Sequence, residues 1–252
     1  MLRWRTYLWM LVLPFFLFSC NEQKQEAPSR YAISWFYPNN DYQHWVRTQD
    51  SSAQFIELYS QSYEDLDSIL STCNGLILTG GSDIAPDRFG ALDSLAVCGK
   101  PNLRRDSVEL KALEYVKRSG MPTLGVCRVM QMINVSFGGD LILDIPSTVG
   151  SHQHMQKGGD AHHVVYVTPS VRTPFGLDSA ETNSNHHQAI ATLGSGLQPV
   201  AWTSDSIIEA IHHTEATAFP FLWGVQWHPE RMDSDAPMSN DILSSFIKAA
   251  QK

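Results

Sequence analysis

The first half of the chain alternates short apolar runs with stretches whose apolar residues recur at helical spacing. Runs of three to five apolar or β-branched residues are typical of buried strands. Gly120, followed by Pro122, marks the end of the longest helical stretch. The pattern predicts strands over 32–36, 54–58, 76–78 and 123–126, and helices that include 63–70, 105–119 and 129–137.

The second half is richer in short strand-like runs. They predict strands over 162–168, 199–204, 207–213 and 221–227, before a final helix that presents Ile242, Phe246, Ile247 and Ala250 on one face. Segments rich in Ser, Gly and Pro, at 146–151 and 192–196, are expected to be loops. Because strands that alternate with helices favour a parallel sheet covered on both faces, we expect an α/β fold. Its sheet is expected to be doubly wound and mostly parallel, with flanking helices and a strand-rich C-terminal half.

The first twenty residues have the layout of an export signal. Arg3 and Arg5 precede an apolar run over 7–18, which Ser19 and Cys20 follow. This run is shorter than the roughly twenty residues that span a bilayer, which disfavours a permanent membrane helix.

Residues 17–20 resemble a bacterial lipobox, with leucine three positions before the cysteine and a small residue directly before it. The resemblance implies that cleavage leaves Cys20 as a lipidated N-terminus. We therefore expect a lipoprotein-type signal peptide over 1–20, a polar tether over 21–30 and one folded domain over 31–252. The protein would then be an exported cell-envelope lipoprotein, anchored on the periplasmic or outer-surface side of a bacterial membrane.

Charge narrows the range of partners. The net charge is −8, and the scattered lysines and arginines form no basic stripe that could follow a phosphate backbone. We therefore expect a small polar substrate and no nucleic acid, and leave a homodimer open.

Three cysteines remain after Cys20. Their odd number allows one bridge, between Cys73 and Cys98, but buried free thiols fit the spacing equally well. Adjacent histidines on a strand point to opposite faces and cannot bind one ion together, and no CxxC or His/Cys zinc spacing occurs. We therefore expect no metal and no cofactor.

Cys127 lies between the predicted strand 123–126 and the helix that follows. A tight turn at this junction presents its residue at the carboxyl edge of the sheet, as in a nucleophile elbow. The helix N-terminus favours a thiolate and offers unpaired amides, beginning with that of Arg128, to an oxyanion. A structural cysteine under the helix would fit the position equally well.

His228 follows the predicted strand 224–227, and Pro229 prevents that strand from continuing. A histidine there can move the proton of a cysteine nucleophile, and Glu230 can orient its ring. Gly80 and Gly81 follow another strand and can bring a backbone amide close to a substrate carbonyl.

The motifs TGGSDIAP, RRDSVEL, GVCRVMQMINVSFGGDL, NSNHHQ and GVQWHPE occur in an order that resembles the class I glutamine amidotransferase-like superfamily, from about residue 75 to the C-terminus. They look most like its gamma-glutamyl hydrolase branch, typified by gamma-glutamyl-gamma-aminobutyrate hydrolase. The resemblance implies a flavodoxin-like fold. It also implies that Cys127 is the nucleophile, His228 the general base and acid, and Glu230 the residue that orients it.

The resemblance further implies that amides of Arg128 and of Gly80 or Gly81 form the oxyanion hole and that Gln131 borders the γ-glutamyl pocket. The NSNHHQ segment, with Asn183, Ser184, His186 and His187, matches a loop that approaches the substrate.

One position departs from the family. Relatives usually have glycine two residues after the nucleophile, where this chain has Val129, so a branched side chain is expected to shift the turn. A bound γ-glutamyl group would need a cation for its α-carboxylate, and Arg104, Arg105 and Arg128 are candidates. Asp106 is a candidate N-cap of the helix that follows, and 35–37 are aromatic residues expected to pack rather than to line the site.

These residues predict a hydrolase of γ-glutamyl amide or peptide bonds that acts through a γ-glutamyl thioester. Three alternatives remain: a glutaminase subunit that supplies ammonia to a synthase, a lipid-anchored binding protein with little turnover, and a peptidase for γ-linked cell-wall peptides. The expected export signal argues against the first, and the complete triad argues against the second.

Overall fold

The computed structural model of the chain describes residues 27–91, 97–168 and 174–252. The expected signal peptide over 1–20 and most of the expected tether lie outside these residues. The first strand begins at Arg30, one residue before the expected start of the domain. Among the described residues, no helix is long and apolar enough to cross a membrane.

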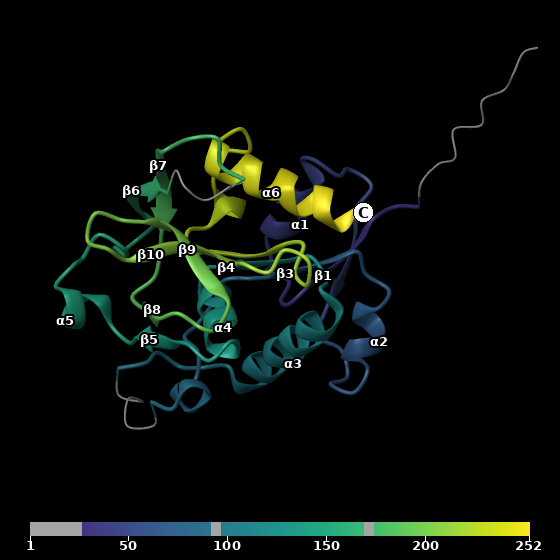
Figure 1. The fold of residues 1–252 in the computed structure, drawn as a ribbon, viewed down its shortest axis with the longest axis horizontal. Helices are drawn as coiled ribbons and strands as arrows, with labels where there is room; N and C mark the ends of the chain where they lie inside the picture. The colour runs from purple at the N-terminus through teal and green to yellow at the C-terminus, as the bar shows by residue number, and fades with distance from the viewer. Residues whose placement is uncertain (1–26, 92–96, 169–173) are drawn as a thin grey trace, which may run out of the picture.

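A nine-stranded mixed sheet runs through the centre of the molecule, in the order β2-β1-β3-β4-β11-β10-β9-β6-β7 (Figure 1). Strands β2 to β11 of this order are mutually parallel, and each later neighbour is antiparallel. The strands are β1 (Arg30–Ile33), β2 (Gln54–Glu57), β3 (Gly75–Leu78), β4 (Thr123–Val126), β6 (Ala161–Val167), β7 (Ser179–Ser184), β9 (Leu197–Trp202), β10 (Ile208–His213) and β11 (Leu222–Val225). A separate pair joins β5 (Asp140–Ile142) to β8 (Ala189–Thr192).

Helices cover both faces of the parallel half (Figure 1). On one face lie α1 (Asp41–Arg47) and α6 (Pro237–Ala250), and on the other α2 (Leu66–Leu70), α3 (Leu103–Ser119) and α4 (Arg128–Ser136). Because strand side chains alternate, Ile77 packs in the core beneath α6 while Leu76 and Leu78 pack in the core beneath α3 and α4. This arrangement confirms the expected flavodoxin-like α/β fold.

The ends of α3 show how local sequence sets its boundaries. The side chain of Asn102 accepts a hydrogen bond from the amide of Arg105 at 3.1 Å, so Asn102 is the N-cap and the expectation for Asp106 was wrong. At the other end Gly120 adopts a left-handed φ of 69°, as its sequence position predicted.

Several elements differ from the pattern. The expected loop at 146–151 contains most of α5 (Ile145–Val149), whose N-cap Asp144 accepts from the amide of Ser147 at 3.0 Å. The short polar strand β7, the short β8 and the helix α1 were not expected. Strand β11 ends at Val225, so His228 lies three residues beyond the strand rather than directly at its end.

Candidate active site

Cys127 forms a strained turn between β4 and α4. Its φ of 51° and ψ of −109° are rare for a residue with a side chain, and the residue is 4% exposed. The close approach of helix to strand falls at Gly125, where an added Cβ would lie 3.1 Å from the backbone carbon and oxygen of Val129. Val129 itself is fully buried, so its branched side chain is accommodated without loss of the turn.

His228 and Glu230 form the second part of the site. His228 Nδ1 lies 2.8 Å from Glu230 Oε1, and both side chains are largely buried. The backbone of His228 is fixed by Asn183, whose side chain donates to its carbonyl and accepts from its amide, both at 2.9 Å. Because Nδ1 is occupied by the carboxylate, Nε2 is free for proton transfer.

The electrostatics of His228 favour its charged form. Burial opposes the charge, but Cys127 and Glu230 outweigh burial through charge and hydrogen bonding and raise the pKa of His228 to about 10. The ring of His228 is therefore protonated at neutral pH, beside the side chains of Cys127 and Glu230.

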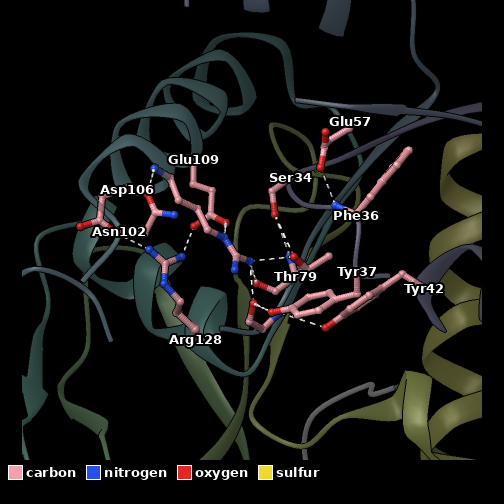
Figure 2. Close-up of polar contacts among 12 residues, drawn as sticks. Ser34, Phe36, Tyr37, Tyr42, Glu57, Thr79, Asn102, Asp106, Glu109 and Arg128 are labelled. Atoms are coloured by element: carbon pink, nitrogen blue, oxygen red, sulfur yellow. Dashed lines mark hydrogen bonds and ion pairs between the residues drawn. The ribbon is translucent and has the colours of Figure 1, made fainter. Parts of the chain in front are cut away.

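The two glycines of the TGG turn play different parts. The amide of Gly80 donates to the hydroxyl of Tyr42 at 2.9 Å, and its carbonyl accepts from the hydroxyl of Tyr37 at 2.9 Å, as Figure 2 shows for the two tyrosines. An added Cβ at Gly80 would lie 2.6 Å from His228 Cε1, so only glycine fits. Within the described part of the chain, the Gly81 amide has no acceptor and is the available oxyanion donor, together with that of Arg128 at the start of α4.

A buried ion network supports this turn (Figure 2). Arg105 donates through Nη2 to the carbonyls of Thr79 and Gly80, at 2.5 Å and 2.6 Å, and through Nε to Glu109 at 2.8 Å. Glu109 also pairs with Arg128. Burial opposes ionisation of Glu109, but the two arginines outweigh it and lower its pKa.

The three arginines proposed to bind an α-carboxylate are therefore committed elsewhere. The guanidinium of Arg128 pairs with Asp106 and Glu109, and Arg105 holds the TGG turn. Arg104 donates to the carbonyls of Tyr59 and Gln61. These contacts with carboxylates and carbonyls disfavour the expectation that one of the three arginines binds substrate.

The site opens into a cavity of about 450 Å³. Of the predicted residues, the cavity wall includes Gly80, Gly81, Cys127, Arg128, Gln131, His186, His187, His228 and Glu230. Asn183 and Ser184, expected to approach substrate, are not in this wall. Asn183 binds the backbone of His228, and the Ser184 hydroxyl donates to the carbonyl of His154 at 2.7 Å.

The cavity also contains residues that sequence reasoning missed. Asp83 accepts from His187 at 2.9 Å, and this hydrogen bond is the main cause of the raised pKa of His187. Tyr37, expected only to pack, lines the cavity with Tyr42 and Arg231. The neighbouring TGGSD motif was a signal for Asp83, whereas nothing in the pattern indicated Tyr42, because α1 was not expected.

Gln131 connects the nucleophile to the cavity wall. Its Nε2 donates to the carbonyl of Gln188 at 2.9 Å and to Gln226 Oε1 at 3.1 Å. Gln226 Nε2 lies 3.5 Å from Cys127 Sγ. Gln131 thus positions the neighbours of the nucleophile from the first turns of α4.

The other two described cysteines are free thiols, so the open possibility of a bridge between Cys73 and Cys98 is excluded in this structure. Cys73 Sγ donates to the carbonyl of Ile69, and Cys98 Sγ accepts from Gln188. Burial raises the pKa of both thiols, which makes them less reactive at neutral pH.

A cysteine on a strained strand-to-helix turn, a carboxylate-oriented histidine and two unpaired amides in one cavity wall define a cysteine hydrolase or amidotransferase of the α/β class. Comparison with known families agrees: residues 17–230 match the Peptidase C26 family, and the chain belongs to that family. It is a glutamine-amidotransferase-type hydrolase.

Individual relatives and solved structures agree with this family assignment. The chain is 33% identical over 185 residues to the glutamine amidotransferase-like protein YvdE of Lactococcus lactis, covering 72% of this chain and 76% of the relative. It is 27% identical over 201 residues to one subunit of the glutamine-hydrolysing GMP synthase of Methanosarcina barkeri, covering 79% and 93%. The glutaminase domain of Trypanosoma brucei CTPS with bound acivicin shares the fold, with a TM-score of 0.58 at 16% identity over 88% of this chain and 94% of that one.

Proposed function

We propose that the protein hydrolyses γ-glutamyl amide or peptide bonds. The observation that carries the proposal is that Cys127, His228 and the two residues with unpaired amides, Gly81 and Arg128, line one cavity that also carries charged side chains. Family membership supports hydrolysis at an amide carbonyl, and the sequence motifs favour the γ-glutamyl branch.

In the proposed reaction, the Cys127 thiolate attacks the γ-carbonyl and forms a carbon–sulfur bond. The carbonyl electrons move to the oxygen, which the amides of Gly81 and Arg128 stabilise. Collapse of this intermediate breaks the carbon–nitrogen bond, and the imidazolium of His228 protonates the leaving amine.

Water completes the reaction. The now neutral His228 takes a proton from water as the oxygen attacks the thioester carbonyl. Collapse expels the thiolate, releases glutamate and leaves the proton on His228. Glu230 stabilises the imidazolium in both halves of the reaction.

The cavity offers complementary charges to the α-amino and α-carboxylate groups of a glutamyl substrate. Asp83 provides a carboxylate, and Arg231, which also pairs with Asp160 at 2.9 Å, provides positive charge at the wall, while hydrogen bonding to Asp83 raises the pKa of His187. His187 is shared between Asp83 and Asp144, at 2.9 Å and 3.3 Å, so its ring is held in place before substrate arrives. The cavity volume lies in the usual range for small-molecule sites and leaves room for a small leaving amine.

A glutaminase subunit is the second candidate, favoured by the similarity to a GMP synthase subunit. The same triad would then use glutamine and deliver ammonia to another chain. Substrate preference separates the two functions.

The test is release of amine by the purified chain from γ-glutamyl amides, γ-linked peptides and glutamine, with matched α-linked compounds as controls. We expect turnover of γ-linked compounds alone, with γ-glutamyl amides or peptides preferred over glutamine. Cys127→Ala should lose activity on the order of a million-fold. Turnover of glutamine alone would favour the glutaminase function, and silence towards every γ-linked compound by folded protein would contradict both.

A further inference from the structure

Glu209 is a fully buried carboxylate on β10 that three histidines surround. Its Oε1 lies 3.4 Å from His154 Nδ1 and 3.5 Å from His186 Nε2, and its Oε2 lies 3.6 Å from His163 Nε2. The side chains of these histidines are 2 or 3% exposed. Within the described residues, none of these facing atoms makes a hydrogen bond. Burial of a carboxylate is costly unless opposite charge stabilises it, so the centre of the cluster favours positive charge.

The outer contacts of two rings fix which nitrogen faces inward without a proton. His186 Nδ1 lies 2.9 Å from the carbonyl of Gln188, which can only accept, so Nδ1 carries the hydrogen. His154 Nε2 lies 3.0 Å from a carboxylate oxygen of Asp205 and donates to it. In their neutral forms, both rings therefore aim a lone pair at the same oxygen of Glu209.

Metal-binding histidines have this arrangement. One ring nitrogen donates to a carboxylate or carbonyl, and the other has a lone pair available for the metal. The spacing agrees. Zinc binds nitrogen and oxygen at about 2.0 to 2.2 Å, so two tetrahedral ligands lie about 3.3 to 3.5 Å apart. The distances from His154 and His186 to Glu209 Oε1 fall at this separation and exceed the usual hydrogen-bond length of about 2.9 Å.

We propose that His154, His186 and Glu209 bind one zinc ion. One ligand atom from each lies within 4.8 Å of the other two, and all three residues are buried. Two imidazoles and a carboxylate are a donor set that suits zinc. His163, on the opposite carboxylate oxygen, closes the fourth side of the cluster and is 4.9 Å from His154 between ring centroids.

A zinc ion at this place departs from the sequence expectation of no metal. That expectation considered adjacent histidines, and the alternation of side chains holds for them, because His162 is exposed on β6 while His163 is buried. The ligands instead come one each from the segment before β6, the segment after β7 and β10. Only the antiparallel half of the sheet brings these three distant segments together.

The proposed zinc site would connect one wall of the catalytic cavity to the central sheet. His186 lines the cavity, and the Gln188 carbonyl that holds its ring also accepts from Gln131. On the other side, the Glu209 carbonyl accepts from the amide of Gln226, whose side chain reaches Cys127. We assign the ion a structural role, because its three ligands are buried and the described side chain that lies 3.5 Å from Cys127 Sγ is that of Gln226, which is not a ligand.

The test uses the full chain without a histidine tag, in a Cys127→Ala background that prevents zinc from binding the catalytic thiolate. After removal of metal with a chelator, zinc alone is titrated by calorimetry. We expect one zinc per chain, and a rise in melting temperature of about 5 to 10 °C when free zinc exceeds the dissociation constant about a hundredfold. Failure to bind zinc would overturn the proposal whatever the protein hydrolyses, because this readout does not depend on activity.

Two variants locate the ion. Glu209→Gln keeps the shape of the side chain and should weaken zinc binding at least about a hundredfold, whereas His162→Gln, an exposed histidine of the same cluster of strands, should leave it unchanged. If Glu209→Gln does not fold, Asp205→Asn removes only the outer carboxylate and should weaken binding about 10- to 100-fold. Binding by Glu209→Gln or Asp205→Asn that equals the parent would place the zinc elsewhere and overturn the assignment.

Discussion

Cys127 holds a backbone conformation that costs about 1 to 3 kcal/mol for a residue with a side chain. Two backbone hydrogen bonds maintain it, from the Cys127 amide to Val225 at 2.7 Å and from the Met130 amide to the Cys127 carbonyl at 3.0 Å. The strained turn places the thiol at the cavity wall, at the start of α4.

Val129 lies in the first turn of α4, two residues after Cys127. Its fully buried side chain packs in the core under α4, so Val129→Gly removes apolar contacts and introduces the poorest ordinary helix former. We expect a loss of about 2 to 4 kcal/mol in the free energy of unfolding, with no gain in turnover. Chemical denaturation measures it, and Val129→Ala should fall in between. Higher activity in Val129→Gly would show that the branched side chain distorts the site.

The charge on His228 predicts the pH profile. Because its folded pKa is raised to about 10, the ring is protonated at neutral pH and loses its proton only as the pH rises through that value. We expect kcat/KM to hold through neutral pH and to fall above about pH 10, as the acid that protonates the amine is lost.

Glu230→Gln provides the control for this profile. Removing its charge removes one cause of the raised pKa of His228, so the alkaline limb should move to lower pH. A wild-type profile that instead rises through about pH 6.5, the ordinary histidine range, would show that neutral His228 is the active form.

At the scale of elements, α3 supports the TGG turn through buried charge rather than apolar packing alone. Glu109 neutralises Arg105 and Arg128 with a fully buried carboxylate. Glu109→Gln removes that charge and should destabilise the fold by about 3 to 5 kcal/mol, or about 10 °C in melting temperature. Activity should also fall, because Arg105 holds the carbonyl of Gly80.

The matched control lies on the same helix. Glu114 is exposed and pairs with Lys117 at 2.7 Å, so Glu114→Gln should change the stability by no more than about 1 kcal/mol. Equal effects of the two substitutions would show that the buried network contributes nothing of its own.

Element prediction succeeded where local signals were strong. The run of β4 and the Gly120 end of α3 were clear, because buried strands and helix C-caps have specific side-chain requirements. It failed for β7, whose residues are mostly polar and whose strand character depends on pairing with β6. The short helix α1 was also not predicted, because the burial of its side chains depends on packing against the sheet.

At the scale of the whole molecule, the placement of Cys127, His228 and Glu230 around one cavity could be predicted, because each follows a strand of the parallel half and parallel strands end at one edge. The roles of Arg105 and Arg128 could not, since their carboxylate partners lie on another helix turn or another element. The cluster around Glu209 could not either, because its histidines meet only after the antiparallel strands pair.

A γ-glutamyl thioester at Cys127 is the central step of the proposed reaction. The direct measurement is mass analysis of protein quenched with acid during turnover of a γ-glutamyl amide, followed by mapping of the modified peptide. We predict one glutamyl group on the peptide that contains Cys127, lost on return to neutral pH and absent in Cys127→Ala. Amine release at a normal rate with no adduct, or with full activity in Cys127→Ala, would contradict the mechanism.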